Sequence, residues 1–527
     1  MTSIITNIVS FKLILVLNLF LFTPSSIIAQ GYTNRAETLD SFYQIQLRYD
    51  MIGGILSFSC KDQEPEFLTV GFSDLKTKST ITPDTPFRVA SISKLITALG
   101  VLKLVESNML DLDTPINHYL DFTIENPNFP DIPITTRHLL SHQSSLRDGT
   151  AYNKFLRLSY TSEVTPALYE LLQSTGEYYS EELFGEQAPG NWFQYSNLGF
   201  GILGTLIEQV SNEAFDVYIK REIFDPIGLK AGFSSYTRSY EELPATLYRK
   251  SDNQWTAQAD QRSSQEEQQA GQQEDSRYPQ NRRDVLIGIN AIPYGPQGGL
   301  RISARDLMTL LGYMQSALSY QNTPEGWLKA ETIAQMTEIQ WHADAQLGDA
   351  YGGLFRAWGL GIHILTGEPT LDVMLEKSAA MFGHSGLAYG LVSSAYFDPE
   401  RGVRLSFITN GIGMTFSVDE RSAFYSVEKD MFELAEDGGS PVKQSLFGLV
   451  KKGAEEGLTS SQSQLTPSTA HTSMTNGTLS LGTKKRFNDR IHNHISMDSL
   501  SLRIIDTPQY QRLRCLKQLG KCVCVYV

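Results

Sequence analysis

The feature that most constrains the fold is the stretch from Phe87 to Leu104, where a loop leads into an apolar helix. Residues three apart lie on one face of a helix, so Ser91 and Lys94 should point the same way. A serine hydroxyl becomes a strong nucleophile when a neighbouring base takes its proton. A lysine amine can be that base once burial or a nearby charge lowers its pKa. The stretch therefore predicts a nucleophile–base pair at a helix N-terminus, where the helix dipole favours negative charge.

The spacing alone has little specificity, because a serine three residues before a lysine is common on helices and turns. The same spacing recurs at three other places in the chain: Ser73/Lys76, Ser426/Lys429 and Ser440/Lys443. Ser91 differs from these because apolar residues surround it and because further polar motifs follow it along the chain.

Composition excludes several classes of protein. The 527 residues carry a formal net charge of -14, which argues against a nucleic-acid partner or an anionic-membrane partner for the main body. Only Cys60 lies in the body, so we expect no internal disulfide there and a large apolar core instead. Cys522 and Cys524 lack the second ligand pair of a zinc site, and we expect no metal.

The first 29 residues resemble a secretory signal. Lys12 precedes an apolar run from Leu13 to Phe22, Pro24 ends that run, and Ala29 offers a small residue at a cleavage site. The run is short for a membrane span. We therefore expect a secreted protein or one in the lumen of the secretory pathway, with membrane attachment only if the segment is not cleaved.

Two later stretches carry polar groups in a pattern that suits a site. Tyr195 and Asn197 alternate across Ser196, so extended backbone would present both side chains on one side. His384 lies in a glycine-containing segment, 382–387, between predicted strands, and a glycine-rich edge strand lets a substrate backbone approach closely. His138 and His142 are four apart, but no glutamate stands between them as in a metallopeptidase helix, so we interpret both as structural.

Taken together, Ser91-Ile-Ser-Lys94, Tyr195-Ser-Asn197 and His384-Ser-Gly386 stand in the order found in the serine β-lactamase-like family. The chain resembles the class C β-lactamases, the DD-peptidases and their esterase and D-aminopeptidase relatives over residues 40–435. The resemblance extends to segments outside the motifs: 137–142, 189–190, 298–300, 304–307 and 359–361.

The resemblance implies roles for individual residues. Ser91 would be acylated, and Lys94 and Tyr195 would share proton transfer, with the ammonium lowering the pKa of the phenol. Which of the two is the base in acylation stays open. Asn197 would hold Lys94 and the substrate amide. The substrate-binding edge would comprise His384, Ser385, Gly386 and Leu387, with the backbone N–H groups of Ser91 and Leu387 as the oxyanion hole. No metal or cofactor is implied.

Two departures from the family pattern bear on the substrate. His384 stands where many members carry lysine, which weakens the fixed positive charge that would bind a carboxylate. Gln143-Ser144-Ser145-Leu146 replaces the usual Thr-Ser-Gly-Leu, and the loss of that glycine would reshape the cleft wall. Both favour an esterase, amidase or peptidase over an enzyme whose main substrate is an antibiotic.

The C-terminal part has a different character. Residues 441–484 are rich in Ser, Thr and Gln and are predicted to be a linker, with a glycosylation sequon at Asn476. Residues 485–527 resemble the opening of an HD-domain deoxynucleotide triphosphohydrolase. That family's metal ligands lie further along than this segment extends, so we interpret it as a truncated fragment without nucleotide chemistry.

The sequence therefore predicts an α+β fold of the β-lactamase/transpeptidase type: an antiparallel sheet flanked by helices, with an inserted, mostly helical subdomain at about 110–300. The hydrolase domain would span 30–440 and contain a polar, disordered insertion at 251–283. The expected function is hydrolysis of an ester, amide or peptide through an acyl-enzyme on Ser91. A non-catalytic binding or scaffold protein of the same fold is the alternative. The partner would be a small-molecule or peptide substrate; the oligomeric state is left open.

Overall fold

The computed structural model describes residues 24–437 except 62, 163, 234–241, 259–285, 345–346, 376–379 and 414–416, together with 513–518 and 521–526. The chain divides into two compact units: Met1–Phe447 with Gln509–Val527, and Gly448–Pro508. The second unit lies outside the described residues, as does most of the predicted signal, linker and C-terminal fragment. Within that fragment, β14 (Leu513–Gln518) and β15 (Lys521–Tyr526) form an antiparallel hairpin.

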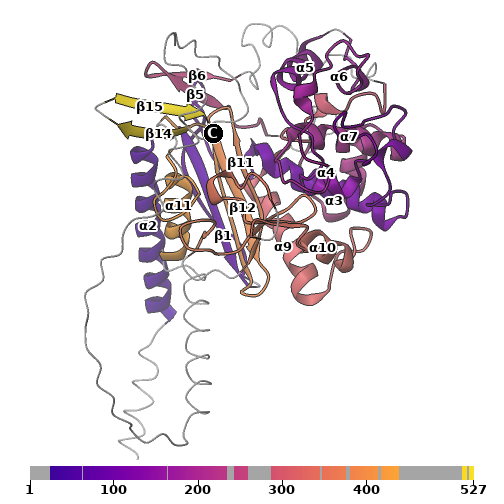
Figure 1. The fold of residues 1–527 in the computed structure, drawn as a ribbon. Helices are drawn as coiled ribbons and strands as arrows, with labels where there is room; N and C mark the ends of the chain where they lie inside the picture. Colours follow the sequence, from indigo (N-terminus) through magenta and orange to yellow (C-terminus); the bar gives the residue numbers. More distant parts are fainter. Residues whose placement is uncertain are drawn as a thin grey trace, which may run out of the picture. The chain divides into compact units, whose positions relative to one another are not determined.

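The centre of the first unit is a nine-stranded antiparallel sheet with the order β3-β2-β1-β13-β12-β11-β10-β9-β8 (Figure 1). The first strand of the sheet thus pairs with the last one, more than 300 positions later, with Ile55 opposite Ile408. The sheet strands are β1 (Gly53–Cys60), β2 (Glu66–Asp74), β3 (Ser79–Thr80), β8 (Trp341–His342), β9 (Ala357–Trp358), β10 (His363–Leu365), β11 (Met381–Ala388), β12 (Leu391–Asp398) and β13 (Val403–Thr409).

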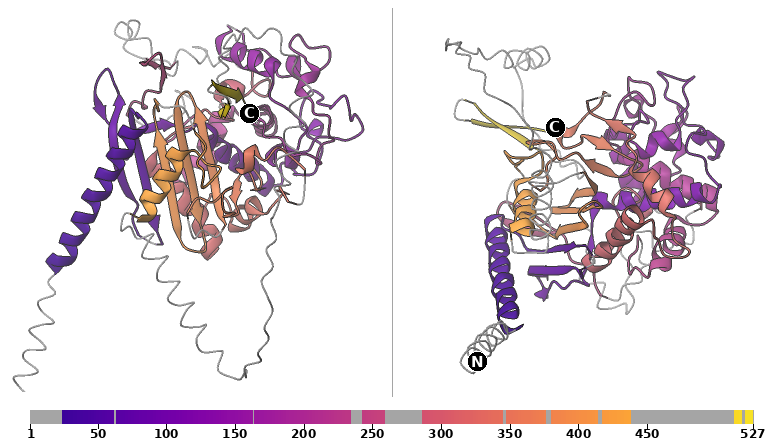
Figure 2. Two further views of the ribbon diagram at one scale, coloured as in Figure 1. Left: turned by 60° about the vertical axis from the view of Figure 1, so that its left-hand side comes forward. Right: turned by 90° about the horizontal axis from the view of Figure 1, so that it is seen from below.

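Both faces of this sheet are covered, and alternate residues of a strand enter different cores. Leu56 packs in one apolar cluster with residues of α2 (Pro24–Arg48) and α11 (Ser426–Asp437). Its neighbour Ile55 packs in the other cluster, which includes residues of α9 (Ala304–Tyr320). Figure 2 shows α2 and α11 lying together against the sheet. All residues of β1 and β12 are buried, as expected for central strands with two covered faces.

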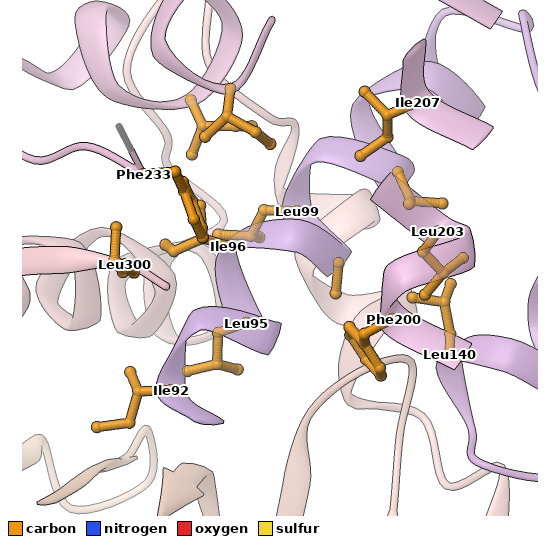
Figure 3. Packing of buried hydrophobic residues seen from close by; sticks show 14 of the residues in the cluster. Ile92, Leu95, Ile96, Leu99, Leu140, Phe200, Leu203, Ile207, Phe233 and Leu300 are labelled. Atoms are coloured by element: carbon orange, nitrogen blue, oxygen red, sulfur yellow. The ribbon is translucent and has the colours of Figure 1, made fainter. Parts of the chain in front are cut away.

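The apolar cluster that contains Ile55 continues without a break into the helical region. There α3 (Ser93–Glu106) packs against α7 (Asn197–Ser211). Figure 3 shows Leu95, Ile96 and Leu99 of α3 on one side and Phe200, Leu203 and Ile207 of α7 on the other. The remaining helices are η1 (Ala90–Ile92), η2 (Ile116–His118), α4 (Thr136–Leu140), α5 (Thr150–Thr161), α6 (Tyr169–Leu172), η3 (Glu181–Leu183), α8 (Phe215–Ile219), η4 (Lys220–Phe224), η5 (Asp225–Ile227), η7 (Ile292–Tyr294), α10 (Ala330–Thr337) and η8 (Tyr351–Gly353). Two further two-stranded antiparallel sheets occur in the described residues: β4 (Pro86–Arg88) pairs with β7 (Arg301–Ser303), and β5 (Tyr248–Ser251) forms a hairpin with β6 (Gln254–Ala257).

Most elements predicted from pattern are present, and the predicted α+β fold with its large antiparallel sheet is confirmed. The Ser303 side chain caps α9 by accepting a hydrogen bond from the backbone N–H of Asp306. One local prediction was wrong. Residues 251–257 belong to the β5–β6 hairpin instead of a disordered insertion. None of the helices in the described residues is long and apolar enough to span a membrane.

One contact ties the sheet edge to the helical region. Gly361, in the turn before β10, donates its N–H to the carbonyl of Leu140 at 2.9 Å. Its φ is +74°, and a Cβ there would lie 2.4 Å from the Cβ of Ala98 on α3. Glycine is therefore required at this position for conformation and for space.

We expect Gly361→Ala to lower the free energy of unfolding by about 3 kcal/mol, because left-handed strain and overpacking both contribute. Gly326→Ala is the matched control, since Gly326 has φ +81° but a Cβ there would meet nothing within 4 Å. Gly326→Ala should lower the free energy of unfolding by only about 1 kcal/mol. Chemical denaturation of both variants measures the difference, and equal losses would show that the close approach to Ala98 carries no energetic weight.

Candidate active site

The predicted serine–lysine pair lies at the junction of η1 and α3. Ser91 is in η1, and Lys94, in the first turn of α3, is fully buried. The Nζ atom of Lys94 lies 3.3 Å from the Oγ atom of Ser91, so the structure brings the two residues together. The backbone turns sharply before the serine, because Ala90 has φ +47°, which is uncommon for a residue with a Cβ.

Lys94 binds two other segments as well as Ser91. Its Nζ donates to Asn197 Oδ1 at 2.7 Å and to the backbone carbonyl of Gln297 at 2.7 Å. An ammonium group has three donors, so these contacts account for all of them. Burial lowers the pKa of Lys94 to about 7, and the negative charge of Asp148 acts in the opposite direction. Near neutral pH a large fraction of Lys94 is therefore an uncharged amine next to a hydroxyl.

Tyr195 also reaches the serine. Its hydroxyl makes a side-chain hydrogen bond with Ser91, and its ring lies under Lys94, with Nζ 4.8 Å from the ring centroid. Burial raises the pKa of Tyr195 far above its usual value, and the hydrogen bond with Ser91 only partly offsets this. The family resemblance implied a phenol made more acidic by the ammonium. The structure contains a phenol that stays protonated, because the hydroxyl is desolvated and Lys94 contacts the ring.

Aromatic rings hold Tyr195 in place. Phe355 stacks on it at a centroid distance of 5.5 Å, and His142 lies 4.4 Å away. The Nδ1 atom of His142 accepts a hydrogen bond from the backbone N–H of Ser196, which orients the imidazole. The other histidine of this segment, His138, accepts at Nδ1 from the backbone N–H of Thr135 in a capping box. Both histidines are therefore used in structural contacts, and no group of metal-ligating side chains occurs within the described ranges.

The segment from His384 to Leu387 lies in β11, beside η1. A Cβ on Gly386 would lie 2.4 Å from the carbonyl oxygen of Val89, so glycine permits this approach. Ser385 Oγ lies 3.0 Å from the hydroxyl of Tyr396. Leu387 is opposite Val392 of β12 and lies four residues beyond Gly383, which pairs with His363 of β10.

His384 is buried and uncharged. Its Nδ1 lies 2.6 Å from the carbonyl oxygen of Ser385, so Nδ1 carries the proton and donates. Burial and the nearby Lys94 lower the pKa of His384 well below its usual value. Its Nε2 is thus an acceptor, and no hydrogen-bond partner for it occurs among the described residues.

Two participants were missed by sequence reasoning, Asp148 and Gln297. Gln297 acts through its backbone carbonyl, which no side-chain pattern can reveal. Asp148 binds Asn197 although 49 positions separate them. The only sequence signal for Asp148 was its position just after Gln143-Ser144-Ser145-Leu146, the segment that departs from the family pattern.

The structure explains locally how Ser145 can replace the glycine of the family pattern. Ser145 stands where glycine is usual and has φ +62°, in the region that favours glycine. Its hydroxyl donates to the carbonyl of Gln187 at 2.5 Å and accepts from the side chain of Asn126 at 2.8 Å. These hydrogen bonds hold the left-handed conformation without a glycine.

The family model for β-lactamase matches residues 44–425, which is more than half of the chain. The chain belongs to the β-lactamase family. Penicillin-binding protein 4* of Bacillus subtilis is 30% identical over 159 residues, 30% of this chain and 33% of that protein. The serine β-lactamase-like protein LACTB, mitochondrial, of Mus musculus is 25% identical over 414 residues, 63% of this chain and 68% of that protein. The first of these matches spans only a third of the relative's length.

A solved structure shares the fold. The octameric penicillin-binding protein homologue from Pyrococcus abyssi superposes with a TM-score of 0.53 at 21% identity, over 79% of this chain and 80% of that one. The identity is too low to carry more than the fold. Membership of the β-lactamase family supports a function of the serine-hydrolase type in general.

The lowered pKa of Lys94 can be measured directly. With lysine labelled with ¹³C at Cε, we expect one resonance to titrate with a midpoint near pH 7, because burial disfavours the ammonium. The spectrum of Lys94→Met should lack that resonance, which assigns it. If every lysine resonance of the folded protein titrates near the ordinary value of about 10.4, the amine is not neutral at physiological pH.

Proposed function

We propose that this protein is a serine hydrolase that forms an acyl-enzyme on Ser91 and acts on an ester, amide or peptide. One observation carries the proposal: the Oγ atom of Ser91 lies 3.3 Å from a buried lysine amine whose pKa is about 7. A buried lysine is costly to keep in a core, and its placement beside a partly exposed serine suits catalysis better than stability.

In acylation, the neutral amine of Lys94 takes the proton of Ser91 as Oγ bonds to the substrate carbonyl carbon. We assign this role to Lys94 because the phenol of Tyr195 stays protonated. As the tetrahedral intermediate collapses, Tyr195 gives its proton to the leaving oxygen or nitrogen and regains one from the Lys94 ammonium. Water then attacks the acyl ester, with its proton returning through the same groups.

The backbone N–H groups of Ser91 and Leu387 would stabilise the oxyanion, and Asn197 would orient Lys94 and the substrate amide. Ser385 and Gly386 would line the edge on which the substrate lies. These assignments rest on the family motifs and on the proximity of β11 to η1.

The substrate class follows from His384. A neutral imidazole provides no fixed cation, so a substrate carboxylate gains little there. The proposal therefore favours neutral esters and amides over β-lactams and other carboxylate-bearing acyl donors.

The proposal also includes a secretory-pathway location, which is supported by the apolar run near the N-terminus.

A fluorophosphonate probe tests the nucleophile. We expect a single covalent adduct on the wild-type protein by intact-mass analysis, with labelling that rises as the pH passes about 7, because the uncharged amine is the base. Ser91→Ala should abolish the adduct. The matched control is Ser426→Ala, which removes a serine with the same spacing to a lysine on another helix and should label normally. A folded wild-type protein that is never labelled would support the binding or scaffold alternative.

His384→Lys tests the substrate class. A cation at this position should raise kcat/KM for a carboxylate-bearing substrate such as a penicillin by about tenfold relative to a neutral ester, since a charge-assisted hydrogen bond becomes available. His384→Gln, which adds no charge, is the control and should leave the ratio of the two substrates near its wild-type value. A ratio that changes equally in both variants would show that charge at position 384 does not select the substrate.

A further inference from the structure

Asp148 accepts hydrogen bonds from one end of the site. Its carboxylate oxygens accept from the backbone N–H of Asn197 at 2.9 and 3.0 Å and from that of Leu198 at 2.9 Å. They also accept from Ser196 Oγ at 3.1 Å and from Asn197 Nδ2 at 2.9 Å. A single carboxylate thus caps the N-terminus of α7 and holds the asparagine side chain at the same time.

The contact with Nδ2 decides which way the amide of Asn197 faces. A carboxylate can only accept, so the amide must turn its NH2 group toward Asp148. Its oxygen then faces the opposite way, where it accepts from Lys94 Nζ at 2.7 Å. If the amide were reversed, its NH2 group would face the donors of the lysine. The carboxylate therefore acts on Lys94 through the fixed orientation of Asn197.

The same carboxylate acts on Lys94 electrostatically. The titratable groups around the amine are Tyr195 beneath it, His142 after α4, His384 on β11 and Asp148. Both imidazoles are neutral and the phenol is protonated, because burial shifts the pKa of each group toward its uncharged form. Asp148 is the group in this set that raises the pKa of Lys94, against the larger effect of burial.

We propose that Asp148 is a positioning residue: it fixes the amide of Asn197 and, through it, the place of the Lys94 amine, while its charge acts on that amine directly. This inference rests on the proposed function, because its consequence for rate requires Lys94 to act on Ser91. Asp148 does not contact the reacting atoms, so its role is indirect.

Two variants separate charge from position. Asp148→Asn removes the negative charge, so the limb of the pH–rate profile that belongs to Lys94 should move to lower pH by about one unit. The rate of Ser91 labelling at the optimum should also fall, by about 10²-fold, because Asn197 is no longer held. Asp148→Glu keeps the charge but alters its reach, so the rate should fall while the limb stays in place.

Glu208→Gln is the matched control. Glu208 is a buried carboxylate on the same helix that also accepts backbone hydrogen bonds, from Phe215 at 3.0 Å and Gly288 at 3.0 Å. Its replacement should change thermal stability without moving the limb. A limb that moves equally in Asp148→Asn and Glu208→Gln, or that moves in neither, would overturn the inference.

The lysine resonance provides a readout that does not depend on catalysis. We expect the Lys94 midpoint, measured by ¹³C NMR at Cε, to fall by about one pH unit in Asp148→Asn and to stay unchanged in Glu208→Gln. If wild-type Ser91 is never labelled but this shift occurs, the proposed function fails while the coupling of Asp148 to Lys94 holds. If labelling occurs and the midpoint does not move, the inference fails and the proposed function stands.

Discussion

The site depends on one buried amine. An ammonium placed in an apolar core loses its hydration, and this cost is tolerated only when its donors find acceptors. Lys94 meets this requirement with three oxygens from three separate segments: Ser91 in η1, Asn197 at the start of α7, and the carbonyl of Gln297. A fold that buries Lys94 must therefore bring these segments together. The same burial lowers the pKa of the amine to about 7, so a large fraction of it is uncharged near neutral pH and can accept a proton.

Two apolar cores meet at this point. The helix that carries Lys94 packs in the cluster that joins the helical region to one face of the sheet. Tyr195 packs in the cluster on the other face. Strand β11 runs beside η1 between them, and it can do so because Gly386 has no side chain to strike the Val89 carbonyl. The distance between the phenol and the serine is thus set by the packing of both faces of the sheet.

Much of this arrangement was predictable, because local rules govern it. The spacing of Ser91 and Lys94 on a helix and the alternation of Tyr195 and Asn197 both follow from backbone geometry, and each pair occurs as expected. The family motifs placed His384 beside them. Asp148 was missed because its partners lie on another element, and a carboxylate that caps a distant helix has no local pattern. The acidity of Tyr195 was predicted in the wrong direction, since it depends on how deeply the hydroxyl is buried.

By itself, the sequence determined the elements, the apolar faces that join them and the choice of candidate catalytic side chains, because these depend on residue type and on spacing along one helix or strand. The tertiary structure decided the protonation of those side chains. A pKa depends on desolvation and on charges from other segments, so Lys94, Tyr195 and His384 acquire their chemical states only when the two cores close around them.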